Sequence, residues 1–180
     1  FNMRVGQSGL RGGRFFANMS LPLDEKGTEL YSFAGMSSRR GNSAGFYRLP
    51  NQSSTYTPIY INGFLPEINS KIKDQSIAVG VRGAISEWDI DFSNTWGKNE
   101  FQYFISNTSN ASLQRASPTS FDAGGFSFIQ NTTNLDISRL FQEVFLGLNI
   151  AFGAEHRFEN YEIVAGERGS YEQYTQNGDV

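Results

Sequence analysis

The segment Ile77–Trp96 (IAVGVRGAISEWDIDFSNTW) alternates apolar and polar residues with a period of two, and this constrains the fold of the whole chain. The period predicts two strands joined by a tight turn at residues 86–87, each strand with unlike environments on its two faces. The apolar pairs then share one face of the hairpin, and the charged pair lies on the other. The residues that this turn sets directly opposite one another include Ile85 and Trp88, Val81 and Phe92, and Arg82 and Asp91.

The same alternation, with turn residues between the stretches, predicts seven strands. They are Asn2–Leu10, Arg14–Leu23, Thr28–Ser38, the two strands of a hairpin from Ser76 to Phe104, Phe126–Ser138 and Val144–Phe158. The connections alternate in length. The short ones lie at residues 24–27, 86–87 and 139–143, and the long ones at residues 39–73 and 106–125, with a polar tail from Glu159.

This alternation of connections favours a membrane β-barrel. Short turns at one end and long loops at the other are typical of outer-membrane barrels, whereas structureless loops beyond about 12–15 residues are uncommon in compact soluble domains. The predicted strands also reach the roughly 9–11 residues that cross a bilayer at a tilt. We therefore expect an all-β fold, an antiparallel up-and-down meander that forms part of a large transmembrane β-barrel. A secreted β-sandwich binding module would show the same alternation and remains an alternative.

The composition excludes several classes of protein. Cysteine is absent, which excludes a disulfide framework, a thiolate nucleophile and a zinc–cysteine site. The net charge is −3 and no basic stripe accompanies the aromatic residues, so no nucleic-acid partner is expected. No apolar run approaches the roughly 18 residues of a membrane-spanning helix, which excludes a helical membrane protein. A membrane β-barrel is not excluded, because every second residue of its strands faces the lumen.

Four phrases stand out between the alternating stretches. They are GFYRLPN at residues 45–51, NGFLPEIN at 62–69, NTSNASLQRASPTSFDAGG at 107–125 and NIAFGAEHRFENYEIVAG at 149–166. Together they resemble the β-barrel portion of TonB-dependent outer-membrane receptors. The resemblance implies a membrane transport protein and not an enzyme. In that family, extracellular loops and a plug domain bind a scarce nutrient, and an inner-membrane energy complex drives its release inward.

The resemblance also implies that the chain is a fragment. The family has an N-terminal plug and a barrel of about 22 strands, and neither a plug-like region nor a closing aromatic strand is recognisable here. We expect residues 1–180 to be a partial barrel segment of one larger domain in the bacterial outer membrane. The expected partners are outer-membrane lipid, the plug and remaining barrel, the TonB complex indirectly, and a small nutrient of the siderophore, cobalamin or oligosaccharide class. A passive porin-like barrel is the alternative within the membrane class.

Loop residues that combine cations with aromatic rings are the candidate ligand contacts. These candidates are Arg39, Arg40, Tyr47, Arg48 and Tyr60. The alternative, which we favour, is that loop aromatics pack against one another and hold the loop in shape. No catalytic residue, cofactor or metal ligand is predicted. His156, the single histidine, has no nearby cysteine or serine partner, and Asp89 and Asp91 fit a solvated polar wall in which Arg82 and Asp91 form an ion pair.

The barrel hypothesis assigns each face of the central hairpin an environment. The residues expected to face lipid are Val79, Val81, Ile85, Trp88, Ile90 and Phe92, and those expected to face the lumen are Arg82, Asp89 and Asp91. Amphipathic rings favour the headgroup level of a membrane. We therefore expect Trp88 and Tyr31 at the rim near the short turns, and Trp96 near the opposite rim.

Overall fold

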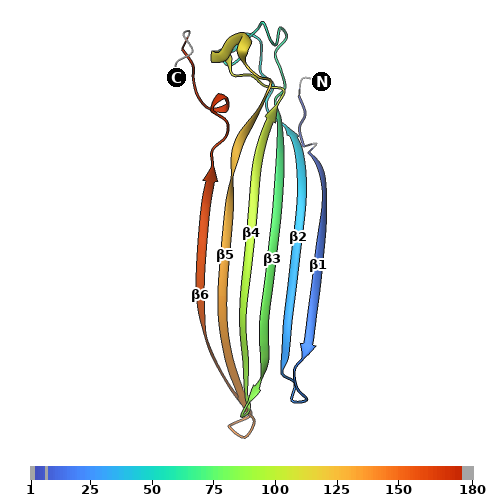
Figure 1. Cartoon of the computed structure of the whole chain (residues 1–180), viewed down its shortest axis with the longest axis vertical. Helices are drawn as coiled ribbons and strands as arrows, with labels where there is room; N and C mark the ends of the chain where they lie inside the picture. Colours follow the sequence, from blue (N-terminus) through green and yellow to red (C-terminus); the bar gives the residue numbers. More distant parts are fainter. Residues whose placement is uncertain (1–2, 7, 176–180) are drawn as a thin grey trace.

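A computed structural model describes residues 3–6 and 8–175 of the chain. These residues form one six-stranded antiparallel sheet in which each strand pairs with its neighbours in the sequence (Figure 1). The strands are β1 (Gly9–Pro22), β2 (Glu29–Ala44), β3 (Glu67–Ile85), β4 (Trp88–Ser106), β5 (Ser120–Phe141) and β6 (Leu148–Val164), and two short 3-10 helices, η1 (Ala111–Ala116) and η2 (Arg168–Ser170), lie outside the sheet. The predicted all-β up-and-down meander is confirmed.

The predicted hairpin is confirmed in its turn and in its register. Ser86 and Glu87 have φ angles of 50° and 69°, and a two-residue turn with positive φ at both positions matches the twist of the flanking strands. Val81 lies opposite Phe92 and Arg82 opposite Asp91, as the alternation requires.

The predicted strand at residues 2–10 is wrong for the part that the structure describes. Asn2 lies outside the described residues, and only Gly9 and Leu10 belong to a strand, as the start of β1. Gly6 has a φ of 71°, a left-handed conformation that interrupts an extended chain. The described residues therefore contain six strands and not seven.

Most strands extend further from the short turns than the alternation predicted. The first long loop comprises residues 45–66, where residues 39–73 were predicted, and the second comprises residues 107–119, where residues 106–125 were predicted. The last strand, β6, continues to Val164. Charged residues made these strand halves look like loops, but they pair across the sheet, as Arg39 does with Asp74 at 2.7 Å. The last short turn lies at residues 142–147 and not at 139–143, because the apolar alternation runs on into the turn itself.

The two ends of the sheet differ in the length of their connections. At one end lie residues 23–28, 86–87 and 142–147. At the other end lie residues 45–66, residues 107–119 and the described residues that precede β1 and follow β6 (Figure 1). We name them the turn end and the loop end. The predicted separation of short from long connections is therefore present.

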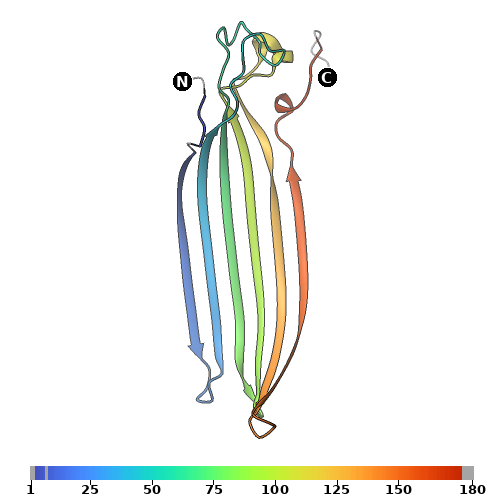
Figure 2. The same ribbon diagram turned by 180° about the vertical axis from the view of Figure 1, so that it is seen from behind.

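The sheet is a single layer. Among the described residues, no second sheet or helix covers the strands on the front or, as Figure 2 shows, on the back. The buried hydrophobic residues of the described chain are Phe64, Ala78 and Phe121. A sheet normally buries one face against another layer to form a core. Among the described residues no helix has the length and apolarity to cross a membrane.

Candidate functional site

Each side of the sheet near the turn end is uniform from strand to strand. Directly opposed residues point to the same side, and one cross-strand row, which defines the Val81 face, is Leu21, Leu30, Val81, Phe92, Leu135 and Ala154. The next row, which defines the Arg82 face, is Pro22, Glu29, Arg82, Asp91, Asp136 and Gly153. In β2, β3, β4 and β5 a one-residue step along the strand thus replaces an apolar side chain with a charged one.

The apolar part of the Val81 face is exposed and has a tryptophan near each limit. Phe92 is 54% exposed although every neighbour in its row is apolar. Trp88, beside the turn end, has ring contacts with Phe141 and Phe152 at centroid distances of 6.1 and 5.8 Å. Trp96 lies eight residues further along β4, or about 26 Å at the usual rise of a strand. All six residues predicted to face lipid lie on this side of the sheet.

Polar side chains within this apolar region bond to one another. The amides of Asn94 and Asn131 donate reciprocally, at 3.0 and 2.9 Å, and Asn94 also donates to the Thr133 hydroxyl at 2.8 Å. His156 lies opposite Thr133, in the middle of β6. Mutual hydrogen bonding would satisfy these amide groups in an apolar environment that offers no other hydrogen-bond partner.

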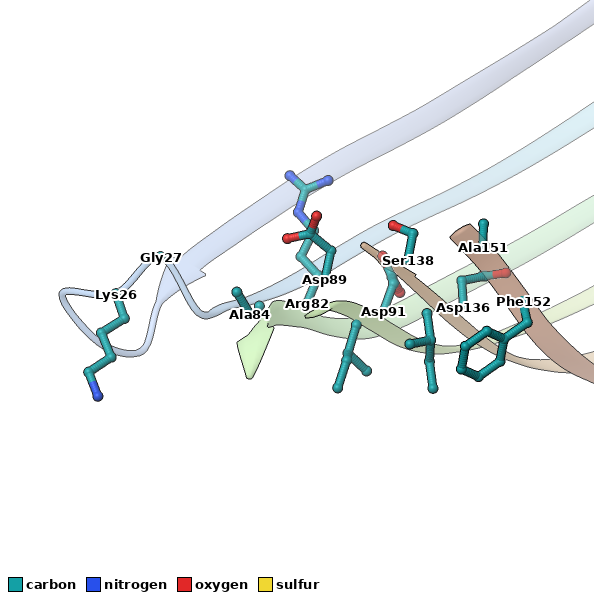
Figure 3. A pocket seen from close by; sticks show the side chains of 13 residues that line it. Lys26, Gly27, Arg82, Ala84, Asp89, Asp91, Asp136, Ser138, Ala151 and Phe152 are labelled. Atoms are coloured by element: carbon teal, nitrogen blue, oxygen red, sulfur yellow. The ribbon is translucent and has the colours of Figure 1, made fainter. Parts of the chain in front are cut away.

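The Arg82 face carries an open, charged hollow at the turn end. Figure 3 shows Arg82, Asp89 and Ser138 projecting to one side of the sheet and Phe152 to the other. The predicted ion pair between Arg82 and Asp91 is wrong, although the two residues are opposite in register. Arg82 pairs with Glu29 on β2 instead.

Tyr31 lies near the short turns as predicted, but on the Arg82 face and not beside Trp88. Its hydroxyl donates to Asp91 at 2.7 Å, so the prediction that Tyr31 and Trp88 form one aromatic rim is wrong. The ring lies over Gly80, where a Cβ would overlap it. Within the described part of the chain, no group of three or more His, Cys, Asp or Glu side chains could hold a metal ion.

Two of the five predicted ligand contacts lie in the sheet and not in a loop. Arg39 and Arg40 belong to β2, where consecutive residues point to opposite faces. Arg39 is on the Arg82 face and pairs with Asp74, whereas Arg40 is on the Val81 face opposite Lys71. These two guanidinium groups therefore do not converge on one ligand.

The other three candidates shape the loop of residues 45–66. Arg48 and Phe64 exchange backbone hydrogen bonds at 2.7 and 3.0 Å, and the Tyr47 hydroxyl donates to the Asn62 carbonyl. The Tyr60 ring lies 4.5 Å from that of Phe64, and burial raises the pKa of its phenol. This packing supports the alternative in which the aromatic residues hold the loop in shape.

The alternation gave no indication of Asn110, the residue that joins the loop end together. Its side-chain amide donates to the carbonyls of Gly169 and Glu172 at 2.9 and 2.8 Å, and its oxygen caps η1 by accepting from the Ser112 amide. Asn107 in turn donates to the carbonyl of Leu65 at 2.7 Å. An asparagine directly before a short helix was the available signal.

A hydroxyl-rich hollow lies at this junction and is the candidate ligand site of the chain. It is lined by residues of three segments, among them Ser53, Ser109, Ser112 and Tyr171. The hydroxyl of Ser109 is buried and has no hydrogen-bond partner. A polar ligand would satisfy such a group, because a buried hydroxyl without a partner costs free energy.

Comparisons of the chain with protein-family models, with curated protein sequences and with solved structures give no significant match in any of the three.

Proposed function

We propose that the chain is a segment of the wall and loops of an outer-membrane β-barrel, of the TonB-dependent receptor type, for nutrient uptake. In this proposal the Val81 face contacts lipid, the Arg82 face lines the lumen, and the turn end lies in the periplasm. The loop end, with its hydroxyl-rich hollow, faces the outside and receives the nutrient. The rest of the barrel and the plug complete the transporter.

The observation that carries the proposal is the exposed apolar band on the Val81 face. It extends from the row of Ile85 to the row of Met36, which is opposite Gln75 on β3. Ten residues of strand span about 33 Å, and a tilt of about 45° reduces this to about 23 Å across the membrane. Outer-membrane barrels have an apolar band of about 25 Å with aromatic residues at its limits, and Trp88 and Trp96 fit that description.

The absence of a core supports the same proposal. A single sheet of strands 14–22 residues long with apolar side chains exposed on one face needs a covering medium, and lipid provides one. β1 and β6 each have one neighbour in the described residues, so both present open edges that a closed barrel would pair. A β-sandwich would require a second sheet against the Val81 face, and the described residues contain none.

The choice of an energy-coupled receptor over a passive porin-like barrel rests on the four phrases that resemble the receptor family. The experiment is to follow the complete protein that carries this chain in cells with and without a functional TonB complex. We expect the protein in the outer-membrane fraction, and we expect nutrient accumulation that stops when the complex is inactivated. Accumulation that continues would favour the passive barrel, and a protein that is monodisperse without detergent would contradict both.

A further inference from the structure

Towards the loop end, the Val81 face changes from apolar to charged. Lys98 lies in the last row of the apolar band, opposite Gln75, and Lys73 lies in the row beyond it, which also holds Glu100 and Glu162. The ammonium groups of Lys98 and Lys73 lie 2.6 and 3.8 Å from the carboxylate oxygens of Glu100. The next row has no carboxylate. It consists of Arg11, Arg40, Lys71, Gln102, Gly125 and Val164.

The first three residues of this row form a cluster of like charge, which we name the cationic row. Arg11 lies directly opposite Arg40, and Arg40 directly opposite Lys71. Like charges in directly opposed positions of a sheet are destabilising. Neither Arg11 nor Arg40 forms a salt bridge within the described residues, and both side chains are exposed. The sheet therefore holds three adjacent positive charges that an anion from outside would stabilise.

The position of the row relative to the apolar band indicates the kind of anion. Lys71 lies four residues beyond Gln75, the last row of the band, which is about 13 Å along the strand and about 9 Å across a membrane at a tilt of about 45°. A headgroup layer extends about 5–8 Å beyond each side of the hydrocarbon core. Arginine and lysine side chains that extend a few ångströms back toward the hydrocarbon core bring their charges to the depth of lipid phosphates.

We propose that Arg11, Arg40 and Lys71 bind the phosphate groups of anionic lipids in the leaflet on the loop side of the membrane. This inference rests on the proposed function, because it requires the Val81 face to contact lipid. Arginine binds phosphate oxygens with two parallel N–H donors. An open hollow over β3 to β6 continues the row, and its lining combines Lys71, Lys73 and Lys98 with the carboxylates of Glu100 and Glu162. The phosphate contacts are therefore assigned to the cationic row and not to this hollow.

Two serines of β2 offer label positions that separate the two proposals. Ser38 lies on the Val81 face between the apolar band and the cationic row, opposite Lys73, and Ser32 lies on the same face within the band, opposite Val79. The chain has no cysteine, so Ser38→Cys and Ser32→Cys each introduce one attachment point for a fluorophore. The complete protein would be reconstituted in vesicles of phosphatidylcholine with phosphatidylglycerol. Quenching by nitroxide-labelled phosphatidylglycerol would then be compared with quenching by nitroxide-labelled phosphatidylcholine.

We expect both lipids to quench the label at position 32 equally, and the anionic lipid to be enriched about fivefold at position 38. The variant R11Q/R40Q/K71Q should lose the enrichment. The matched control R14Q/K26Q/R115Q removes three charges elsewhere, on the Arg82 face, in a turn and in η1, and should retain it.

Each other outcome identifies what is wrong. Equal quenching by the two lipids at position 38, with normal quenching at position 32, overturns the phosphate site and leaves the barrel intact. No quenching by lipid at position 32 overturns the proposed function itself. Enrichment that inorganic phosphate abolishes, at an ionic strength matched with chloride, indicates a site for a free anion and overturns the assignment to lipid. Exclusion of both lipids at position 38 alone indicates a protein partner there.

Discussion

The Val81 face and the Arg82 face are built from alternate residues of the same strands, yet near the turn end one is apolar and the other is charged. In the row of Val81 every residue is apolar across six strands, whereas the adjacent row of Arg82 holds four charged residues. Polar side chains within the apolar band of the Val81 face form hydrogen bonds with one another, as Asn94 and Asn131 do. This difference supports the proposal that the sheet separates an apolar medium from an aqueous one.

The largest expected effect comes from placing a charge on each face at neighbouring positions of β5. Leu135 is in the row of Val81, and Asn134 points to the Arg82 face, opposite Ser93 and Glu155. Leu135→Arg should lower the free energy of unfolding by about 2–4 kcal/mol, the cost of arginine near the middle of a membrane. Asn134→Arg should change it by less than about 0.5 kcal/mol. Urea titration of the complete protein in vesicles measures both, and equal effects would remove the distinction between the faces.

A smaller effect is expected where the Arg82 face is closely packed. Gly80→Ala should destabilise by about 1–3 kcal/mol, because the new Cβ overlaps the Tyr31 ring and displaces the hydroxyl that donates to Asp91. Gly97→Ala is the matched control on the same face, since the nearest atom, the Gln75 carbonyl oxygen, would lie 3.8 Å from its Cβ. The same urea titration compares the two, and a neutral Gly80→Ala would contradict the described position of Tyr31.

A local effect is expected at the loop end. Asn110→Ala removes two hydrogen bonds to the carbonyls of Gly169 and Glu172 together with the cap of η1, at a cost of about 1–2 kcal/mol to the local structure. Limited proteolysis should then cleave residues 107–119 severalfold faster, with the strands still protected. Asn51→Ala, at an exposed position of the other long loop, is the control and should leave the cleavage rate unchanged.

The smallest effect concerns the turn between β1 and β2 and depends on pH. Hydrogen bonds from the Thr28 hydroxyl and from backbone amides hold the pKa of the Asp24 carboxyl below its ordinary value. A lowered pKa stabilises the folded turn above the unfolded-state pKa, and this contribution is lost as the pH falls through the folded-state value. The protection factors of the amides at residues 23–28, which correct for the intrinsic pH dependence of exchange, should therefore fall at acid pH in the natural protein. In Asp24→Asn this fall should be absent.

The sequence predicted best what depends on alternation alone. The turn at residues 86–87, the register of β3 with β4 and the separation of short from long connections are all correct. The extent of the strands beyond the apolar band could not be predicted from the sequence, because Arg39 and Lys71 look like loop residues until their cross-strand neighbours are known. The role of Asn110 could not be predicted for a similar reason, since the carbonyls that accept its hydrogen bonds lie about 60 residues away in the sequence.

The most direct test of the two-sided wall is a nitroxide scan along β4, at Ile90, Asp91, Phe92 and Ser93, in the complete protein in vesicles. Collision with oxygen, which concentrates in lipid, would be compared with collision with a water-soluble nickel chelate. The labels at positions 90 and 92 should collide mainly with oxygen and those at 91 and 93 mainly with nickel. A scan without this alternation, with all four labels either shielded or in water, would contradict the assignment of the Val81 face to lipid.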